Sequence, residues 1–267
     1  MGKLYIVEGI PGSGKTTTAT WLADILQDQG NDVKIYLEGN SENPADYESI
    51  SCLSALQLKE LEKDFPDIRS YATQKQNRFF IPYGNLYEKN PHLHHALKAY
   101  DVYGLPIEDF CEVTLAKWKE FVEMARSDND VYVLECCFLQ NPYTFLLAKH
   151  DVPKEQIFNH IDKITGIIAE LDPVILYFEQ DNIEESLNSV RKDRSKEWFE
   201  FLTWYYTEQS YGQARNLQGE AGVIQFLKER KELEKETLAQ LRIKSLLLNN
   251  SEYDWEKRKE EILAFIR

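Results

Sequence analysis

The residues best suited to chemistry form a glycine-rich segment close to the start of the 267-residue chain. The segment runs from Gly9 to Thr16 and fits the pattern G-x-x-x-x-G-K-[ST] at every position. In such a segment the glycines let backbone N–H groups turn toward phosphate oxygens, the lysine reaches the β- and γ-phosphates, and the last hydroxyl contacts Mg²⁺. The sequence therefore predicts a nucleoside-triphosphate site, whose binding residues, with the next position included, are Gly9, Ile10, Pro11, Gly12, Ser13, Gly14, Lys15, Thr16 and Thr17.

The glycine-rich segment lies where a strand and a helix are expected to meet. An apolar run at residues 4–8 precedes it and indicates a buried strand. Residues 16–29 follow with the apolar spacing of one helical face, and Gly30 stands where a helix ends. Strand, glycine loop and helix in this order form the Walker A arrangement, in which the first helical turn adds its positive dipole end to the phosphate site. The alternative, a glycine-rich turn beside a surface lysine, requires neither element.

Two acidic residues are expected at the same edge of a sheet. Glu38 follows a strand expected at residues 33–37, and Glu135 ends an apolar run at residues 131–134. The carboxyl ends of parallel strands form the ligand crevice of open α/β sheets, so both carboxylates are expected near the phosphates. We expect Glu135 to hold Mg²⁺ together with Thr16, and Glu38 to bind an acceptor or take its hydroxyl proton. For each acid, an ordinary carboxylate at a strand end remains the alternative.

A basic segment follows the fourth expected strand, at residues 174–178. Arginines that close over a transferring phosphoryl group stabilise its charge, and Arg191 and Arg194 are three positions apart, so they would share one helical face. We expect both to point at the phosphates as part of a lid. The alternative is a solvated basic turn that offsets nearby acids. In the loop after the third strand, Gln140 and Asn141 are candidates for contact with substrate, although amides are also common in turns.

The remaining pattern predicts an α/β protein with three layers. A strand expected at residues 245–248 completes a parallel sheet of about five strands, and helical periodicity between the strands places helices on both faces. We expect one P-loop domain over residues 1–267, with a largely helical insertion at about residues 39–130 and a helical lid region at about residues 182–242. One set of aromatic and apolar residues in the lid region has the spacing of a core face: Trp198, Phe201, Leu202 and Tyr205.

Composition limits the partners of this chain. The formal net charge of −14 opposes close approach to nucleic acid, so we expect no nucleic-acid partner. No run approaches the ~18 apolar residues of a membrane span, and the start of the chain lacks the pattern of a secretory leader, so we expect a cytoplasmic protein without a membrane partner. The four cysteines include no C-x-x-C, and the adjacent Cys136 and Cys137 are expected as small buried residues at a strand end rather than as a redox switch.

In this chain order, four features resemble those of P-loop small-molecule kinases, in the nucleoside and nucleoside-monophosphate kinase-like branch. They are the glycine-rich segment, the strand ending at Glu38, the strand ending at Glu135, and the arginines Arg191 and Arg194. The resemblance implies a sheet of order 2-3-1-4-5, a mobile helical lid, ATP with Mg²⁺ as the phosphoryl donor, and a role as base for Glu38. In that branch an arginine commonly follows the acid of the third strand, whereas here Cys136 follows Glu135.

The sequence thus favours an ATP-dependent phosphotransferase that moves the γ-phosphoryl group to a small-molecule acceptor with the help of Mg²⁺. The expected metal ligands are Thr16 and Glu135, and the expected catalytic residues are Lys15, Glu38, Glu135, Arg191 and Arg194. The alternative is a nucleotide-gated binding or regulatory protein with slow or no hydrolysis, and a kinase acting on a macromolecule is a third interpretation. The acceptor, the choice between ATP and GTP, and the oligomeric state stay open.

Overall fold

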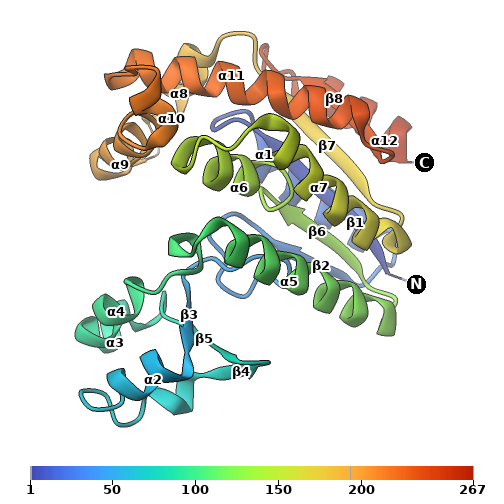
Figure 1. Cartoon of the computed structure of the whole chain (residues 1–267). Helices are drawn as coiled ribbons and strands as arrows, with labels where there is room; N and C mark the ends of the chain where they lie inside the picture. Colours follow the sequence, from blue (N-terminus) through green and yellow to red (C-terminus); the bar gives the residue numbers. More distant parts are fainter. Residues whose placement is uncertain (1, 193, 267) are drawn as a thin grey trace. The chain divides into compact units, whose positions relative to one another are not determined.

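Five parallel strands form the sheet that carries the glycine-rich segment (Figure 1). The computed structural model describes residues 2–192 and 194–266. In the order β2-β6-β1-β7-β8, the strands of the sheet are Val33–Tyr36, Val131–Glu135, Lys3–Gly9, Val174–Glu179 and Lys244–Asn249. Counted along the chain, these five strands have the order 2-3-1-4-5, which confirms the predicted parallel sheet. The central strand β1 is therefore flanked on both sides, and its carboxyl end leads directly into the glycine-rich loop.

Helices cover both faces of this sheet, so the protein has the three-layer P-loop fold that the sequence predicts (Figure 1). Helices α1 (Lys15–Asp28) and α12 (Trp255–Ile266) pack on one face, where the apolar residues of α1 meet alternate strand residues such as Tyr5 and Val7. Helices α7 (Lys154–Ile168) and α11 (Gly219–Gln240) lie on the other. Because side chains alternate along a strand, Glu8 of β1 and its register partner Tyr177 of β7 point away from the α1 face.

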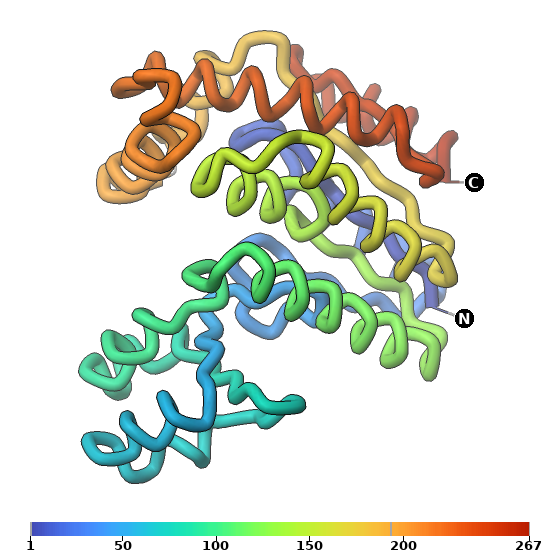
Figure 2. Tube along the Cα trace, viewed as in Figure 1, coloured from blue at the N-terminus to red at the C-terminus, as the bar shows by residue number. Residues whose placement is uncertain are grey.

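The segment between β7 and β8 is helical, as its sequence pattern predicts, and Figure 2 traces it in orange and red. Before α11 it contains α8 (Ile183–Val190), α9 (Lys196–Thr207) and α10 (Ser210–Ala214). The side chains of Asn182 and Ser195 accept hydrogen bonds from the first-turn N–H groups of α8 and α9, which explains where these helices begin. The expectation that Phe201 belongs to a core face is wrong, because its side chain is 57% exposed.

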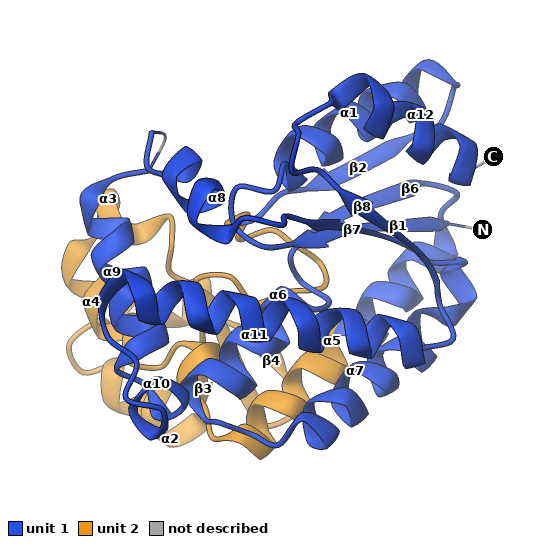
Figure 3. Cartoon of the chain, turned by 90° about the horizontal axis from the view of Figure 1, so that it is seen from above, with its two compact units in different colours: residues 1–38, 118–267 blue, residues 39–117 orange. Residues whose placement is uncertain are grey.

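The chain divides into two compact units, drawn in different colours in Figure 3. Unit 1 comprises the residues up to Glu38 and from Trp118 onward, and it contains the five-stranded sheet. Unit 2 comprises Gly39–Lys117. The long helix α5 (Ile107–Ser127) begins in unit 2 and ends in unit 1, where Trp118 and Phe121 contact each other edge to face. The predicted insertion at about residues 39–130 therefore contains unit 2, but its last part, from Trp118 onward, belongs to unit 1.

Unit 2 has a small antiparallel sheet that the sequence pattern did not predict. Its order is β3-β5-β4, with strands Ile50–Ser54, Arg78–Pro82 and Thr73–Lys75. The helices α2 (Ala55–Leu61), α3 (Leu86–Lys89) and α4 (Pro91–Lys98), with a 3₁₀ turn at Ile68–Tyr71, pack around a separate apolar core. A second 3₁₀ turn follows at Val102–Gly104. In the described part of the chain, no helix is both long and apolar enough to cross a membrane.

Candidate functional site

The glycine-rich loop joins the end of β1 to the start of α1 and has a backbone that requires glycine. Gly14 caps the N-terminus of α1 with φ 100°, in the left-handed region. A Cβ atom at Gly14 would lie 2.5 Å from the indole of Trp255, and a Cβ at Gly9 would lie 2.2 Å from the carbonyl oxygen of Phe178. Side chains at these two positions are therefore excluded both by the backbone angles and by close neighbours.

Hydrogen bonds from neighbouring elements fix the peptide units of this loop. The Ser186 hydroxyl of α8 donates to the carbonyl oxygen of Pro11 at 2.7 Å. The Asn250 amide, which follows β8, donates to the carbonyl oxygen of Ser13 at 2.9 Å. Since the C=O and N–H of one trans peptide unit point in opposite directions, the N–H groups that follow these carbonyls point away from Ser186 and Asn250. With the unpaired first-turn N–H groups of α1, they form the kind of donor set that binds phosphate.

Lys15 is the cation of this loop, and its side chain is almost completely buried. Its ammonium donates to the carbonyl oxygen of Ile10 at 3.0 Å. Burial opposes the charged form of Lys15, but the nearby carboxylates of Glu38 and Glu135 favour it, and the pKa of Lys15 is raised above its usual value. The ammonium therefore keeps its charge at neutral pH, as a phosphate-binding lysine must.

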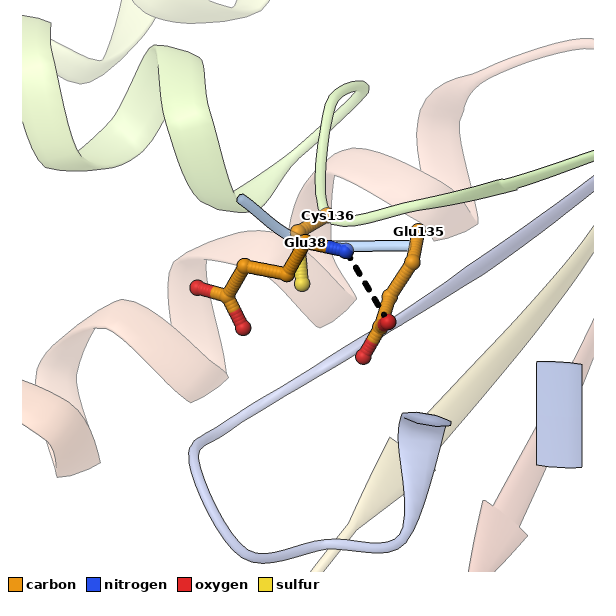
Figure 4. Close-up of side chains that lie close together, drawn as sticks. All are labelled: Glu38, Glu135 and Cys136. Atoms are coloured by element: carbon orange, nitrogen blue, oxygen red, sulfur yellow. Dashed lines mark hydrogen bonds between the residues drawn. The ribbon is translucent and has the colours of Figure 1, made fainter. Parts of the chain in front are cut away.

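The two predicted acids lie together beside the loop (Figure 4). The Thr16 hydroxyl donates to Oε1 of Glu135 at 2.8 Å, and the backbone N–H of Glu38 donates to Oε2 of Glu135 at 3.1 Å. The carboxylate of Glu38 in turn accepts a hydrogen bond from Nε2 of Gln140 at 2.7 Å. These contacts link the helix α1, the ends of β2 and β6, and the loop after β6 into one hydrogen-bonded arrangement at the carboxyl edge of the sheet.

The donor atoms of this arrangement fit a magnesium ion. Ligand atoms of Glu38, Glu135 and Cys136 lie within 4.8 Å of one another. Mg²⁺ prefers oxygen ligands, which Thr16 and Glu135 supply. Burial raises the pKa of the Cys136 thiol well above its usual value, so this sulfur stays protonated and is a poor ligand. The residues present therefore suit an oxygen-bound divalent cation more than a thiophilic one.

A pocket of about 460 Å³ adjoins the loop and the two acids, and every residue that lines it belongs to unit 1. Of the two predicted lid arginines, Arg194 lines this pocket, with its guanidinium 5.6 Å from the ring centre of Trp198. Arg191 instead forms an ion pair of 2.5 Å with Glu220 and lines a different pocket. The expectation that both arginines lie on one helical face and point to the same place is not met, because α8 ends at Val190.

Aromatic side chains also line the pocket, and the sequence pattern had assigned one of them to a core face. They are Trp198 of α9, Tyr253 in the turn before α12, and Trp255 of α12. Aromatic faces of this kind can stack on a nucleobase. Sequence reasoning did not place them in the pocket, because an aromatic residue at helical spacing is equally typical of a core.

A fully buried acid, Glu8, holds the loop that follows β6. One carboxylate oxygen of Glu8 accepts the N–H groups of Phe138 at 2.8 Å and Leu139 at 2.9 Å, and the other accepts the N–H of Gln140 at 3.1 Å. Burial raises the pKa of Glu8 to about 7, with a smaller contribution from Glu234, although the three N–H groups act in the opposite direction. No sequence pattern indicates these contacts, because Glu8 closes an apolar run and its partners are backbone groups far along the chain.

A buried ion pair lies on α11, on the face of the sheet opposite α1. The side chains of Arg230 and Glu234 are both 0% exposed, with 3.2 Å between Nε and Oε1. The Tyr177 hydroxyl of β7 donates to the other oxygen of Glu234 at 2.7 Å. Glu234 raises the pKa of Arg230, which more than offsets the effect of burial. Opposite charges four positions apart on a helix usually lie in solvent, so the pattern alone did not single out this pair.

The sequence matches no known protein family and no curated protein. Among solved structures, the chain is similar to a deoxyadenosine kinase from M. mycoides with bound dATP, at 12% identity and a TM-score of 0.45, over 98% of each chain. This similarity concerns the arrangement of the chain and not its reaction.

Proposed function

We propose that this protein is an ATP-dependent phosphotransferase that moves the γ-phosphoryl group of ATP to a hydroxyl group of a small molecule. The observation that carries the proposal is the placement of Lys15, Thr16 and Glu135 next to Glu38 in one pocket. The first three residues suit a triphosphate with its metal ion. Glu38 has an exposed carboxylate in the same pocket, where it can meet a second substrate.

The reaction follows from these positions. The loop N–H groups and Lys15 bind the β- and γ-phosphates, and Arg194 stabilises negative charge on the moving group. The acceptor oxygen forms a bond to the γ-phosphorus while the bond to the β,γ-bridging oxygen breaks, so that ADP leaves. The carboxylate of Glu38 takes the proton of the acceptor hydroxyl. Thr16 and Glu135 would hold Mg²⁺, which supplies charge neutralisation for the phosphates.

A transfer assay tests this proposal. The full chain is incubated with Mg²⁺ and ATP labelled on the γ-phosphate, together with a panel of nucleosides and deoxynucleosides and, separately, a metabolite extract. We expect a new labelled compound with the wild-type protein and none with Lys15→Met. The control is Lys63→Ala, which removes an exposed lysine of unit 2 and should leave transfer unchanged.

The assay also separates the proposal from its main alternative. Stoichiometric binding of ATP without any labelled product would contradict the phosphotransferase and favour a nucleotide-gated binding protein. Transfer that persists in a correctly folded Lys15→Met protein would show that the glycine-rich loop is not the donor site.

A further inference from the structure

We propose that Glu8 is a positioning residue of the phosphotransferase site, which fixes the loop after β6 and, through Gln140, sets the orientation of the Glu38 carboxylate. This inference rests on the proposed function for its catalytic meaning. The contacts themselves lie wholly within unit 1 and can be tested without knowing the acceptor.

Glu8 holds the loop after β6 by hydrogen bonds to its backbone. Three consecutive N–H groups, from Phe138 to Gln140, donate to its two oxygens within 3.1 Å. A carboxylate is the side chain that can accept all three, because both of its oxygens are acceptors and neither carries a proton. An amide of the same shape would turn an NH₂ group toward at least one of these donors. The charged form of Glu8 therefore makes all three hydrogen bonds at full strength.

Gln140 connects this loop to the carboxylate of Glu38. Gln140 is only 8% exposed, and its Nε2 donates to Oε1 of Glu38 at 2.7 Å. In the described part of the chain, Oε1 of Gln140 is buried without a hydrogen-bond partner. An unpaired buried acceptor is costly and calls for an explanation. The orientation of Glu38 explains the unpaired oxygen of Gln140. Glu8 holds the backbone of Gln140, and the side-chain NH₂ group of Gln140 holds Glu38.

Several titratable groups lie near the buried carboxyl of Glu8. Glu234 of α11 and Tyr177 of β7 lie on the same side of the sheet, and Cys136 lies in the loop itself; Arg230 balances the charge of Glu234. Burial is the main reason that the pKa of Glu8 is raised to about 7. Above that pH the carboxylate accepts all three N–H groups, whereas below it one oxygen carries a proton. The grip on the loop should therefore weaken as the pH falls through neutrality.

A nuclear magnetic resonance titration of the full ¹⁵N-labelled chain tests the grip directly. We expect the backbone amide signals of Phe138, Leu139 and Gln140, and the side-chain NH₂ signals of Gln140, to shift together with a midpoint near pH 7. The Glu8→Gln protein should lack this transition. A common midpoint near the ordinary value for glutamate, or a transition that survives in Glu8→Gln, would overturn the proposal. The wild-type titration decides the matter even if Glu8→Gln does not fold.

Kinetics then test the effect on the reaction. Misplacement of a catalytic group by a fraction of an ångström to 1 Å costs about 10- to 100-fold in rate, so we expect Glu8→Gln to lower kcat by that factor at pH 8 with an unchanged KM for ATP. The matched control is Glu179→Gln at the end of β7, which should have little effect. In a double variant with Gln140→Ala, the Glu8 substitution should cause no further loss, because both act through one contact.

The outcomes of the kinetic test are distinct. A loss in Glu8→Gln no larger than that in Glu179→Gln, or losses that multiply in the double variant, would overturn the positioning role. If the wild-type protein phosphorylates no acceptor at all, the proposed function fails, and the amide titration still decides whether Glu8 controls the loop.

Discussion

The buried pair of Arg230 and Glu234 provides a stringent test of how the interior beneath the sheet is built. Removing one partner of a buried ion pair leaves an uncompensated charge and costs about 3–5 kcal/mol. In this protein burial already raises the pKa of Glu234, and Arg230 is the largest influence that opposes this rise. Without Arg230 the Glu234 carboxyl can therefore take up a proton, which limits the loss. We expect Arg230→Met to lower the free energy of unfolding by about 3 kcal/mol, near the lower end of that range.

Two further variants sharpen this prediction. In Arg230→Met/Glu234→Gln the unpaired charge is gone, while an amide oxygen still accepts the Tyr177 hydroxyl, so we expect part of the lost stability to return. The control is Lys228→Met, an exposed residue on the same helix, which should change stability by less than about 0.5 kcal/mol.

Tryptophan fluorescence during urea unfolding is the suitable assay. All five tryptophans lie in the residue ranges of unit 1, so the signal reports on this unit even if unit 2 unfolds separately. An Arg230→Met protein as stable as Lys228→Met would contradict a stabilising role for the pair of Arg230 and Glu234. So would a double variant whose loss equals the sum of the two single losses, because paired residues must be coupled.

Three further outcomes follow from the site and its surroundings. Burial lowers the pKa of His160 to about 4, so the contribution of this residue to stability is complete above pH 6.5 and is lost as the pH falls toward 4. Over this range the free energy of unfolding of the wild type, measured in urea, should fall by about 3 kcal/mol relative to that of His160→Gln. Parallel plots of unfolding free energy against pH for the two proteins would contradict this. Arg194→Ala should lower kcat at least about 100-fold and Arg191→Ala less than about 3-fold, and equal losses would show that the observed side-chain positions do not persist during turnover. Glu135→Gln should raise the Mg²⁺ concentration needed for half-maximal transfer roughly tenfold, with binding of metal-free ATP measured by calorimetry as the unchanged control.

Glu8 and His160 have opposite effects on the pH dependence of stability. The pKa of Glu8 is raised from 4.5 to about 7, so the folded state binds this proton more tightly than the unfolded state does. Stability from this group is therefore present at low pH and is lost as the pH rises from about 4.5 to about 7. The histidine contribution changes in the reverse direction over an overlapping range. The wild-type curve should consequently be shallow, and single variants are needed to reveal each contribution.

The glycine-rich loop was predictable because its conformation depends on local sequence. The segment from Gly9 to Thr16 needs left-handed glycines and a lysine at fixed spacing, and both requirements are visible in a few consecutive letters. The parallel strands were equally clear, because strands buried on both faces are continuous apolar runs. The positions of Glu38 and Glu135 at the carboxyl ends of two such strands then bring them to one edge of the sheet.

The rest of the site depends on contacts between distant parts of the chain. Glu8 binds backbone N–H groups, which have no sequence signature. Arg191 and Arg194 diverge because the helix ends before them, and the element boundary is the weakest part of any pattern. The small sheet of unit 2 includes a strand of only three residues, Thr73–Lys75, which is too short to show an alternating pattern.

Phosphoryl transfer by three folded proteins, the wild type, Lys15→Met and Glu38→Gln, shows whether the pocket is a phosphotransferase site. Transfer of the labelled γ-phosphate to the acceptor is measured beside ATP binding. We expect transfer by the wild type, none by Lys15→Met, and a loss of about 10²–10⁴ in kcat for Glu38→Gln with ATP binding unchanged. Equal transfer by the wild type and Glu38→Gln, or a wild type that binds ATP and transfers nothing, would contradict the claim that both halves of a phosphotransferase site meet in this pocket.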